Sequence, residues 1–148
     1  MTKQRKQPLT KTEFDMIYSK VPRLCVEVIL RSEKGGVWLA KRKTDPAKGL
    51  WYTPGGTVLM NELLADSVKR IAAEELLITE ITAKPKMIDT IEYNFSTYAG
   101  FPISVAYEIN TAQTPQIGLD EEEVKLFMKL PEKMIPEHRE FLMKHYKF

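Results

Sequence analysis

Residues 51–78, WYTPGGTVLMNELLADSVKRIAAEELLI, place two glycines ahead of an acidic amphipathic segment. The glycines end a short strand in a turn, and the spacing after them predicts a helix that Asn61 caps and that runs to about Leu77. Its apolar residues recur at roughly helical spacing and are expected to face the core: Leu64, Val68, Ile71 and Leu76. Several carboxylates share this helix, and they repel one another unless a positive group lies among them. The segment therefore raises the hypothesis of a bound metal ion.

The charged residues of this segment have a regular spacing. Five residues separate Gly56 from Glu62, and seven separate Glu62 from Arg70. Glu74 and Glu75 follow after three more residues. A chance match of this kind is expected on the order of once in ten thousand such chains at ordinary residue frequencies. A solvated charged face is the ordinary interpretation of one glutamate pair, but this spacing favours a functional site.

The remaining segments alternate between strand and helix patterns. Strands are expected at residues 23–32, 35–43, 84–95, 101–109 and 124–130, with a hairpin loop at 96–100. Helices are expected at 11–20, ending before Pro22, in a turn after Pro131, and after Pro136 at 137–148. Strands followed by helices without strict alternation predict an α+β fold, a sandwich with a mixed β-sheet.

Length and composition limit the classes of function. The 148 residues fit one domain, 1–148, in which 1–11 is expected to be a flexible basic tail. A net charge of +2 is too small to indicate nucleic acid or a membrane as the main partner. No apolar run has the length of a secretory signal or a membrane span, so a cytoplasmic location is expected. The single Cys25 is expected to be a buried strand residue.

The spacing from Gly56 to Glu75 resembles the Nudix box, G-x5-E-x7-R-E-U-x-E-E-x-G-U, in which U is an aliphatic residue. The resemblance implies a Nudix-type α/β/α sandwich. It also implies Mg²⁺-dependent hydrolysis, with Mn²⁺ as the alternative ion, of a nucleoside diphosphate linked to another group. Mg²⁺ takes oxygen ligands, commonly one or two carboxylates together with substrate phosphates.

Two positions depart from the box. Ile71 stands where the box has an acid, and Leu77 stands where it has a glycine. Without the first acid, Glu74 and Glu75 are expected to supply the metal ligands of the helix, with Glu75 the better candidate. The Gly55 carbonyl is expected to add an oxygen, and Arg70 is expected to hold the acidic groups in place.

A longer resemblance covers residues 12–80. KRKTDPAKGLWYTPGG, at 41–56, is similar to the corresponding part of the GDP-mannose mannosyl hydrolases, a Nudix subgroup that also lacks the acid after the arginine. The resemblance implies a nucleotide sugar as substrate, with Arg42 at the diphosphate and Glu27 on its sugar or phosphate side. Each of these residues is otherwise an exposed strand charge.

Aromatic residues near the predicted entrance offer stacking surfaces for a base or a sugar. Trp51 and Tyr52 are the main candidates, with Tyr93 or Tyr98 beside them. Core packing is the alternative for each of them. By analogy with the subgroup, a homodimer formed through the N-terminal helix is a further expectation.

The subgroup uses a histidine on a late acidic loop as its general base, but this loop reads LDEEEV, 119–124. Glu121 or Glu122 is expected to complete the metal site or to deprotonate the attacking water, unless the loop is merely solvated. His138 and His145 fall in the terminal helix and are expected at the surface.

Three functions remain open from the sequence. The first is attack of water on a phosphorus atom of the diphosphate. The second is attack at the sugar carbon, which releases free sugar and nucleoside diphosphate. The third is a Nudix-fold module that binds a nucleotide without turnover, which the isoleucine at 71 and the missing loop histidine keep open.

Overall fold

A computed structural model of the chain describes residues 8–93 and 101–148. Its helices are α1 (Lys11–Tyr18), α2 (Leu64–Leu76) and α3 (Pro136–His145). Its strands are β1 (Arg23–Arg31), β2 (Val37–Arg42), β3 (Trp51–Tyr52), β4 (Gly55–Thr57), β5 (Lys86–Glu92), β6 (Pro102–Ile109) and β7 (Glu121–Phe127). The order of the elements agrees with the pattern in the sequence.

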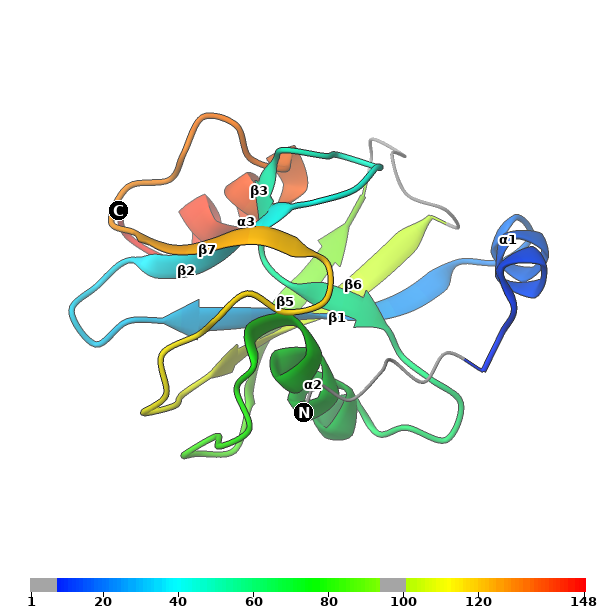
Figure 1. Cartoon of the computed structure of the whole chain (residues 1–148), viewed down its shortest axis with the longest axis horizontal. Helices are drawn as coiled ribbons and strands as arrows, with labels where there is room; N and C mark the ends of the chain where they lie inside the picture. The colour runs from blue at the N-terminus through cyan, green and yellow to red at the C-terminus, as the bar shows by residue number, and fades with distance from the viewer. Residues whose placement is uncertain (1–7, 94–100) are drawn as a thin grey trace.

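The strands form one mixed sheet, with β3-β2-β1-β6-β5 as its main order (Figure 1). β1 runs parallel to β6, whereas β2 is antiparallel to β3 and β7, and β5 is antiparallel to β6. β1 lies at the centre and is buried along most of its length, since both faces of the sheet are covered there.

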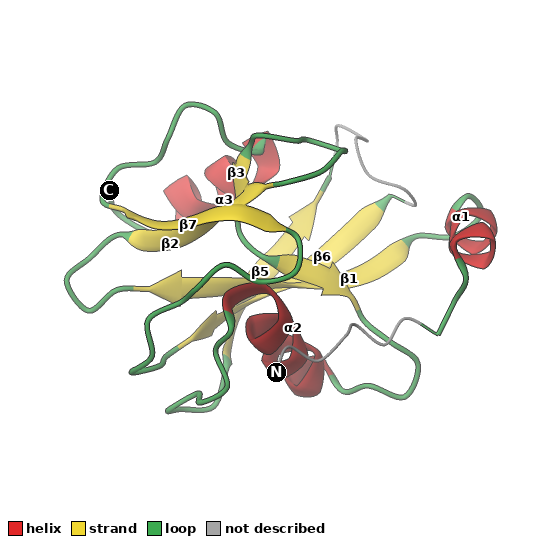
Figure 2. Cartoon of the chain, in the orientation of Figure 1, coloured by secondary structure: helices red, strands yellow, loops and turns green. Residues whose placement is uncertain are grey.

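Two apolar clusters lie on opposite faces of the sheet. On one face, α2 packs Val68 and Ile71 against Val26 and Val28 of β1. On the other face, α3 contributes Phe141 and Leu142 to a cluster with residues of β1 and β2. Figure 2 shows the sheet between these two helices. The predicted α/β/α sandwich with a mixed sheet is therefore confirmed.

The sheet divides along one edge of β1. Leu30 and Arg31 pair with β2, whereas Cys25–Glu27 pair with β4 instead. β4 consists of the two glycines and the threonine after them, and residues 58–63 connect it to α2. This division places the glycines beside both Glu27 and the buried face of α2.

Several predicted boundaries are wrong. α2 begins at Leu64 after Leu63, and Asn61 does not cap it but has a positive φ of 62°. No helical turn follows Pro131 before α3. The predicted hairpin is confirmed as β5 and β6, whereas its loop at 96–100, with Tyr98, lies outside the described residues.

No helix within 8–93 and 101–148 combines the length and the apolarity that crossing a bilayer requires. The helix expected at 11–20 is confirmed as α1, which lies at one end of the molecule in Figure 1. Thr10 and Glu13 form a capping box at its start.

Candidate active site

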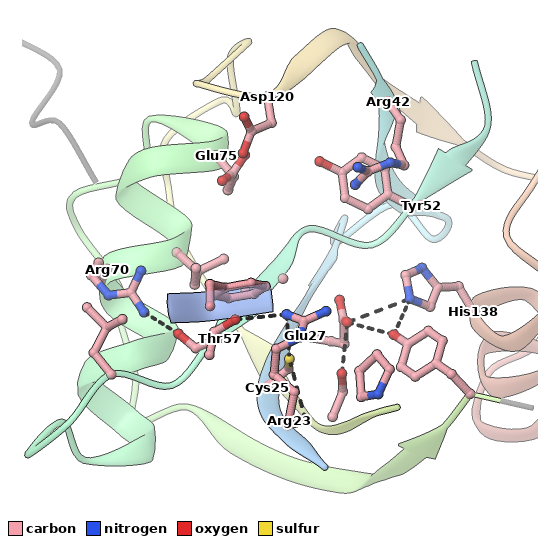
Figure 3. Close-up of a pocket in the computed structure, with 18 residues that line it drawn as sticks. Arg23, Cys25, Glu27, Arg42, Tyr52, Thr57, Arg70, Glu75, Asp120 and His138 are labelled. Atoms are coloured by element: carbon pink, nitrogen blue, oxygen red, sulfur yellow. Dashed lines mark hydrogen bonds and ion pairs between the residues drawn. The ribbon is translucent and has the colours of Figure 1, made fainter. Parts of the chain in front are cut away.

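A cavity of about 230 Å³ opens where the divided edge of β1 meets α2, the loop before β7 and the start of α3 (Figure 3). Its lining includes six predicted site residues, namely Glu27, Arg42, Tyr52, Gly55, Arg70 and Glu75. These residues come from distant parts of the sequence. The cavity is therefore the candidate active site.

Arg70 connects the helix to the segment that precedes it. Its Nε and Nη2 donate to the two carboxylate oxygens of Glu62 at 2.7 and 2.9 Å, and Nη2 also donates to the Thr57 carbonyl at 2.9 Å. Its Nη1 donates to Glu74 at 3.3 Å. Arg70 thus has the bridging position expected from the spacing, and the bidentate pair fixes the start of α2.

Glu62 is held as a carboxylate in this arrangement. Partial burial opposes its ionisation, but hydrogen bonds from Arg70, the Ser67 hydroxyl and the Leu59 amide outweigh that effect and lower its pKa to about 2. The Leu59 amide and the Ser67 hydroxyl donate to the same Glu62 oxygen, so Glu62 links the turn before α2 to the first turn of the helix.

Glu75 and Asp120 approach the cavity from α2 and from the loop before β7. Figure 3 shows both carboxylates directed toward the same part of the cavity. Glu75 is only 1% exposed, so a carboxylate there is taken largely out of water. Within 8–93 and 101–148 no three His, Cys, Asp or Glu side chains form a metal cluster. A cation here therefore needs ligands besides carboxylates.

The loop before β7 is attached to the end of α2. The Leu119 amide donates to the Glu74 carbonyl at 3.0 Å, and the Gln116 amide donates to the Leu76 carbonyl at 2.9 Å. Gly118 lies so close that a Cβ there would overlap the Glu74 carbonyl. These contacts satisfy carbonyls at the end of the helix and bring Asp120 to the cavity.

Glu121 lies next to Asp120, and its carboxylate accepts hydrogen bonds from within the protein. Its Oε1 accepts the Tyr52 hydroxyl at 2.8 Å, and its Oε2 accepts the Asp120 amide at 3.1 Å. Burial, followed by the charges of Glu121 and Glu75, raises the pKa of Tyr52 well above its usual range. Tyr52 therefore remains a neutral donor that holds Glu121.

Arg42 lies on the wall of the cavity above Tyr52. Its guanidinium carbon is 5.3 Å from the centre of the Tyr52 ring, and its Nε donates to the Pro46 carbonyl. The stacking contact and the hydrogen bond fix the plane of the guanidinium. This fork of donors suits the oxygens of a diphosphate.

Glu27 is buried in another part of the cavity, so it is not a solvent-facing strand residue. Its Oε1 accepts the hydroxyls of Tyr93 at 2.7 Å and Ser104 at 3.0 Å, and its Oε2 accepts the Thr53 hydroxyl at 3.4 Å. A Cβ on Gly55 would overlap Oε2. Glycine at 55 therefore makes room for this carboxylate.

His138 is not at the surface as expected, because its turn of α3 faces the sheet. It is 2% exposed, with Nδ1 at 3.1 Å from the Thr53 amide and Nε2 at 2.6 Å from the Tyr93 hydroxyl. His145 is closer to the expectation, since it lies in a partly exposed position 3.2 Å from Asp89.

Four other predicted site residues do not line the cavity. Glu74 pairs with Arg70, and Glu121 is turned toward Tyr52. Trp51 packs edge-on against Phe127, with ring centres 4.6 Å apart. Glu122 is exposed at the irregularity in the pairing of β2 with β7, which turns its side chain away.

Some of the lining residues have no signal in the sequence. Arg23 donates to the Thr57 hydroxyl at 2.8 Å, and its guanidinium carbon lies 5.5 Å from the centre of the Phe14 ring. A strand that starts with a charged residue is too common to indicate a site. Asp120 was within the acidic loop, but the choice among its carboxylates depends on the pairing of β7.

Ile71 has a packing role at the position where the box has an acid. Its side chain is fully buried, and its Cδ1 occupies the space where a Cβ on Gly56 would lie. An isoleucine at 71 therefore packs the glycine turn against the core, whereas a carboxylate there would be desolvated.

Comparison with known proteins supports what the geometry indicates. A family model described as the NUDIX domain matches residues 21–145. The low-salt glycan biosynthesis protein Agl8 of Haloferax volcanii is 34% identical over 114 residues, which are 77% of this chain and 70% of that protein.

Solved structures share the fold. The MutT NUDIX hydrolase from Burkholderia pseudomallei has a TM-score of 0.76 at 21% identity, over 86% of this chain and 100% of that chain. A bifunctional NMN adenylyltransferase/ADP ribose pyrophosphatase from Francisella tularensis, complexed with AMP and Mn ion, has a TM-score of 0.71 at 19% identity, over 90% of this chain and 46% of that chain. At these identities the likeness is one of fold.

A mixed sheet between helices, with a glycine turn leading into a helix whose arginine pairs with two glutamates, defines the class of Nudix-fold proteins. The family model matches most of the chain, and the protein belongs to the Nudix family. It is a Nudix hydrolase, a class of enzyme that acts on small molecules with divalent metal ions.

Proposed function

We propose that this hydrolase cleaves nucleotide sugars, with Mg²⁺ as its cofactor and Mn²⁺ as the alternative ion. The observation that carries the proposal is the division of the cavity into two parts (Figure 3). Glu75 and Asp120 lie together in one part, with Arg42 across the cavity from them beside Tyr52, whereas Glu27 lies among hydroxyl groups in the other. A metal-bound diphosphate suits the first part, and sugar hydroxyls suit the second.

The donor set of the first part fits a hard divalent cation. Glu75 and Asp120 offer carboxylates from two elements, and Gly55, which also lies against Glu27, lines the cavity as the source of a backbone oxygen. Mg²⁺ commonly combines one or two carboxylates with substrate phosphates and water, so two carboxylates are enough. When bound, the ion neutralises charge on the diphosphate and lowers the pKa of a bound water.

Arg70 in the cavity wall and three glutamates outside the cavity support this cation site. Arg70 holds Glu74 and Glu62, and so fixes the turn of α2 from which Glu75 projects. Glu121 fixes the backbone at Asp120. Glu74 and Glu121 thus act as positioning residues, and Asp120 takes the role that the sequence suggested for Glu121 or Glu122.

Arg42 and Glu27 recognise the two ends of the substrate. The Arg42 fork donates to the diphosphate oxygens and stabilises the negative charge that develops on them as water attacks phosphorus. The Glu27 carboxylate accepts hydrogen bonds from sugar hydroxyls. The glycan biosynthesis protein at 34% identity supports a substrate that contains a sugar.

A panel of GDP-, UDP- and ADP-sugars tests the proposal. The purified protein is incubated with each compound and Mg²⁺, and the products are separated and identified. Nucleoside monophosphate and sugar phosphate are the expected products. Free sugar with nucleoside diphosphate would instead locate the attack at the sugar carbon. Tight binding without turnover of any compound would favour a non-catalytic binding module and overturn the proposal.

Glu75→Gln tests the cation site directly. The variant removes one negative charge at almost unchanged volume, so turnover is expected to be lost and Mg²⁺ uptake, measured by calorimetry, to fall sharply. Glu80→Gln, at an exposed position beyond the same helix, is the matched control and should behave like the parent protein. Turnover near the parent rate in Glu75→Gln would refute the metal assignment.

A further inference from the structure

Four polar groups form a continuous chain of hydrogen bonds along the wall of the sugar part of the cavity, which Glu27, Tyr93 and His138 line. The Thr53 amide lies 3.1 Å from His138 Nδ1, and His138 Nε2 lies 2.6 Å from the Tyr93 hydroxyl. The Tyr93 hydroxyl in turn lies 2.7 Å from Glu27 Oε1. All four residues are buried, so water does not compete for these bonds.

The Thr53 amide sets the direction of these hydrogen bonds. A backbone amide can only donate, so Nδ1 of His138 must accept, and the proton of a neutral imidazole then resides on Nε2. Nε2–H donates to the Tyr93 oxygen, and the Tyr93 proton is directed to Glu27. An imidazolium would set a second donor against the Thr53 amide.

The hydroxyl groups beside Glu27 therefore act as donors to its carboxylate. Tyr93 and Ser104 both donate to Oε1, whereas Oε2 lies beside Gly55 and accepts the Thr53 hydroxyl at 3.4 Å. His138 Nε2 lies 3.7 Å from Oε1, so the imidazole acts on the carboxylate mainly through the Tyr93 hydroxyl. Donors on both oxygens fix the orientation of this carboxylate.

We propose that His138 and Tyr93 are positioning residues that hold Glu27 as the hydrogen-bond acceptor for a hydroxyl of the sugar. Neither residue needs to touch the substrate, because their effect is transmitted through the orientation of one carboxylate. This inference rests on the proposed function, in that it assumes a sugar in this part of the cavity.

Nitrogen NMR tests the direction of the chain without any need for activity. In the full-length parent protein, the ¹⁵N shifts of His138 are expected to show a protonated Nε2 and an unprotonated Nδ1. The reverse tautomer would overturn the inference, whether or not the protein hydrolyses nucleotide sugars.

Paired variants test the effect on recognition. His138→Gln keeps a donor near the position of Nε2, whereas His138→Asn keeps only an acceptor near Nδ1. Tyr93→Phe removes one hydroxyl and keeps the ring. His145→Gln, on the same helix, is the matched control. Binding of a nucleotide sugar and of the nucleoside diphosphate without its sugar is measured for each protein with Mg²⁺, alongside KM and kcat.

Tyr93→Phe and His138→Asn are expected to weaken nucleotide-sugar binding about tenfold, which is typical for a misplaced bond to a charged group. KM should rise while kcat changes little, and nucleoside diphosphate binding should remain within about twofold of the parent. His138→Gln should restore most of the affinity, to within about threefold.

The outcomes separate the inference from the proposed function. If the parent cleaves nucleotide sugars and Tyr93→Phe binds them like the parent, the inference fails and the proposed function stands. Equal losses for both ligands in a folded Tyr93→Phe would indicate a merely structural role and would also overturn it. If the parent binds neither ligand, the proposed function fails and the recognition role fails with it. The NMR result still tests the direction of the hydrogen bonds from Thr53 to Glu27.

Discussion

Gly118 lies against the carbonyl of Glu74, with no room for a side chain between the late loop and the last turn of α2. The amides on either side of this contact donate to helix carbonyls. Two residues further on, Asp120 enters the cavity. A single glycine thus connects the geometry of the helix end to the position of an active-site carboxylate.

Gly118→Ala should therefore impair both stability and cation binding. Its Cβ would overlap backbone, which cannot yield as a flexible side chain does, so a loss of about 1 to 3 kcal/mol in the free energy of unfolding is expected. Gln116→Ala, an exposed change in the same loop, should leave both properties unaltered. Thermal unfolding and Mg²⁺ calorimetry measure the two effects. Equal behaviour of the two variants would contradict the role of Gly118.

The Glu62–Arg70 pair should make stability depend on acid pH. The folded-state pKa of Glu62, about 2, lies below its ordinary value of 4.5, so the unfolded chain binds the proton more readily. Its contribution is then complete above about pH 5 and is lost as the pH falls toward 2, with a size on the order of 2 kcal/mol.

Glu62→Gln tests this dependence. Denaturant unfolding should show a less stable variant at pH 7 and a difference that shrinks as the pH falls toward 2. Glu132→Gln, at an exposed position, is the control. A difference that stays constant over this range would show that the charge of Glu62 is not responsible.

Leu77 ends α2 in the left-handed region, with φ 54° and ψ 33°, where the box has a glycine. A residue with a Cβ is strained there by roughly 1 to 2 kcal/mol. Leu77→Gly and Leu77→Ala both remove the side chain, but only the first relieves this strain. The glycine variant should be more stable than the alanine variant by about 1 kcal/mol in chemical denaturation. An alanine variant of equal stability would argue against strain at this position.

Cys25 should be unreactive in the folded protein. Burial, more than any charge nearby, raises the pKa of its thiol to about 11, so little thiolate exists near neutral pH. Alkylation by iodoacetamide at pH 7.5 is expected to be at least about a hundredfold slower than in guanidinium chloride, as followed by mass spectrometry. Comparable rates in the two conditions would show that the cavity exposes the thiol.

Local sequence patterns predicted much of the fold. The apolar spacing of α2 located Val68 and Ile71 in the core, and the β5–β6 hairpin followed from its strand patterns. The expected bridge from Arg70 to two glutamates also formed: Glu74 is four residues away on the same side of α2, and Glu62 reaches Arg70 from the turn just before the helix. Such features depend on residues that are close in sequence, so a local sequence pattern is enough to predict them.

Long-range contacts decided what the patterns could not. His138 was predicted to be a surface histidine because its partners, Thr53 and Tyr93, are 85 and 45 residues away in sequence. The start of α2 moved from Asn61 to Leu64 because Glu62 is held by Arg70 across a turn.

The sequence by itself determined the class of fold, the acidic helix after the glycines and the candidates at Glu27, Arg42 and Glu75. Only the tertiary structure decided that Asp120, rather than Glu121 or Glu122, faces the cavity. The reason is physical: along an irregular strand, adjacent carboxylates point in different directions, and strand pairing together with the contact at Gly118 selects the one that faces inward.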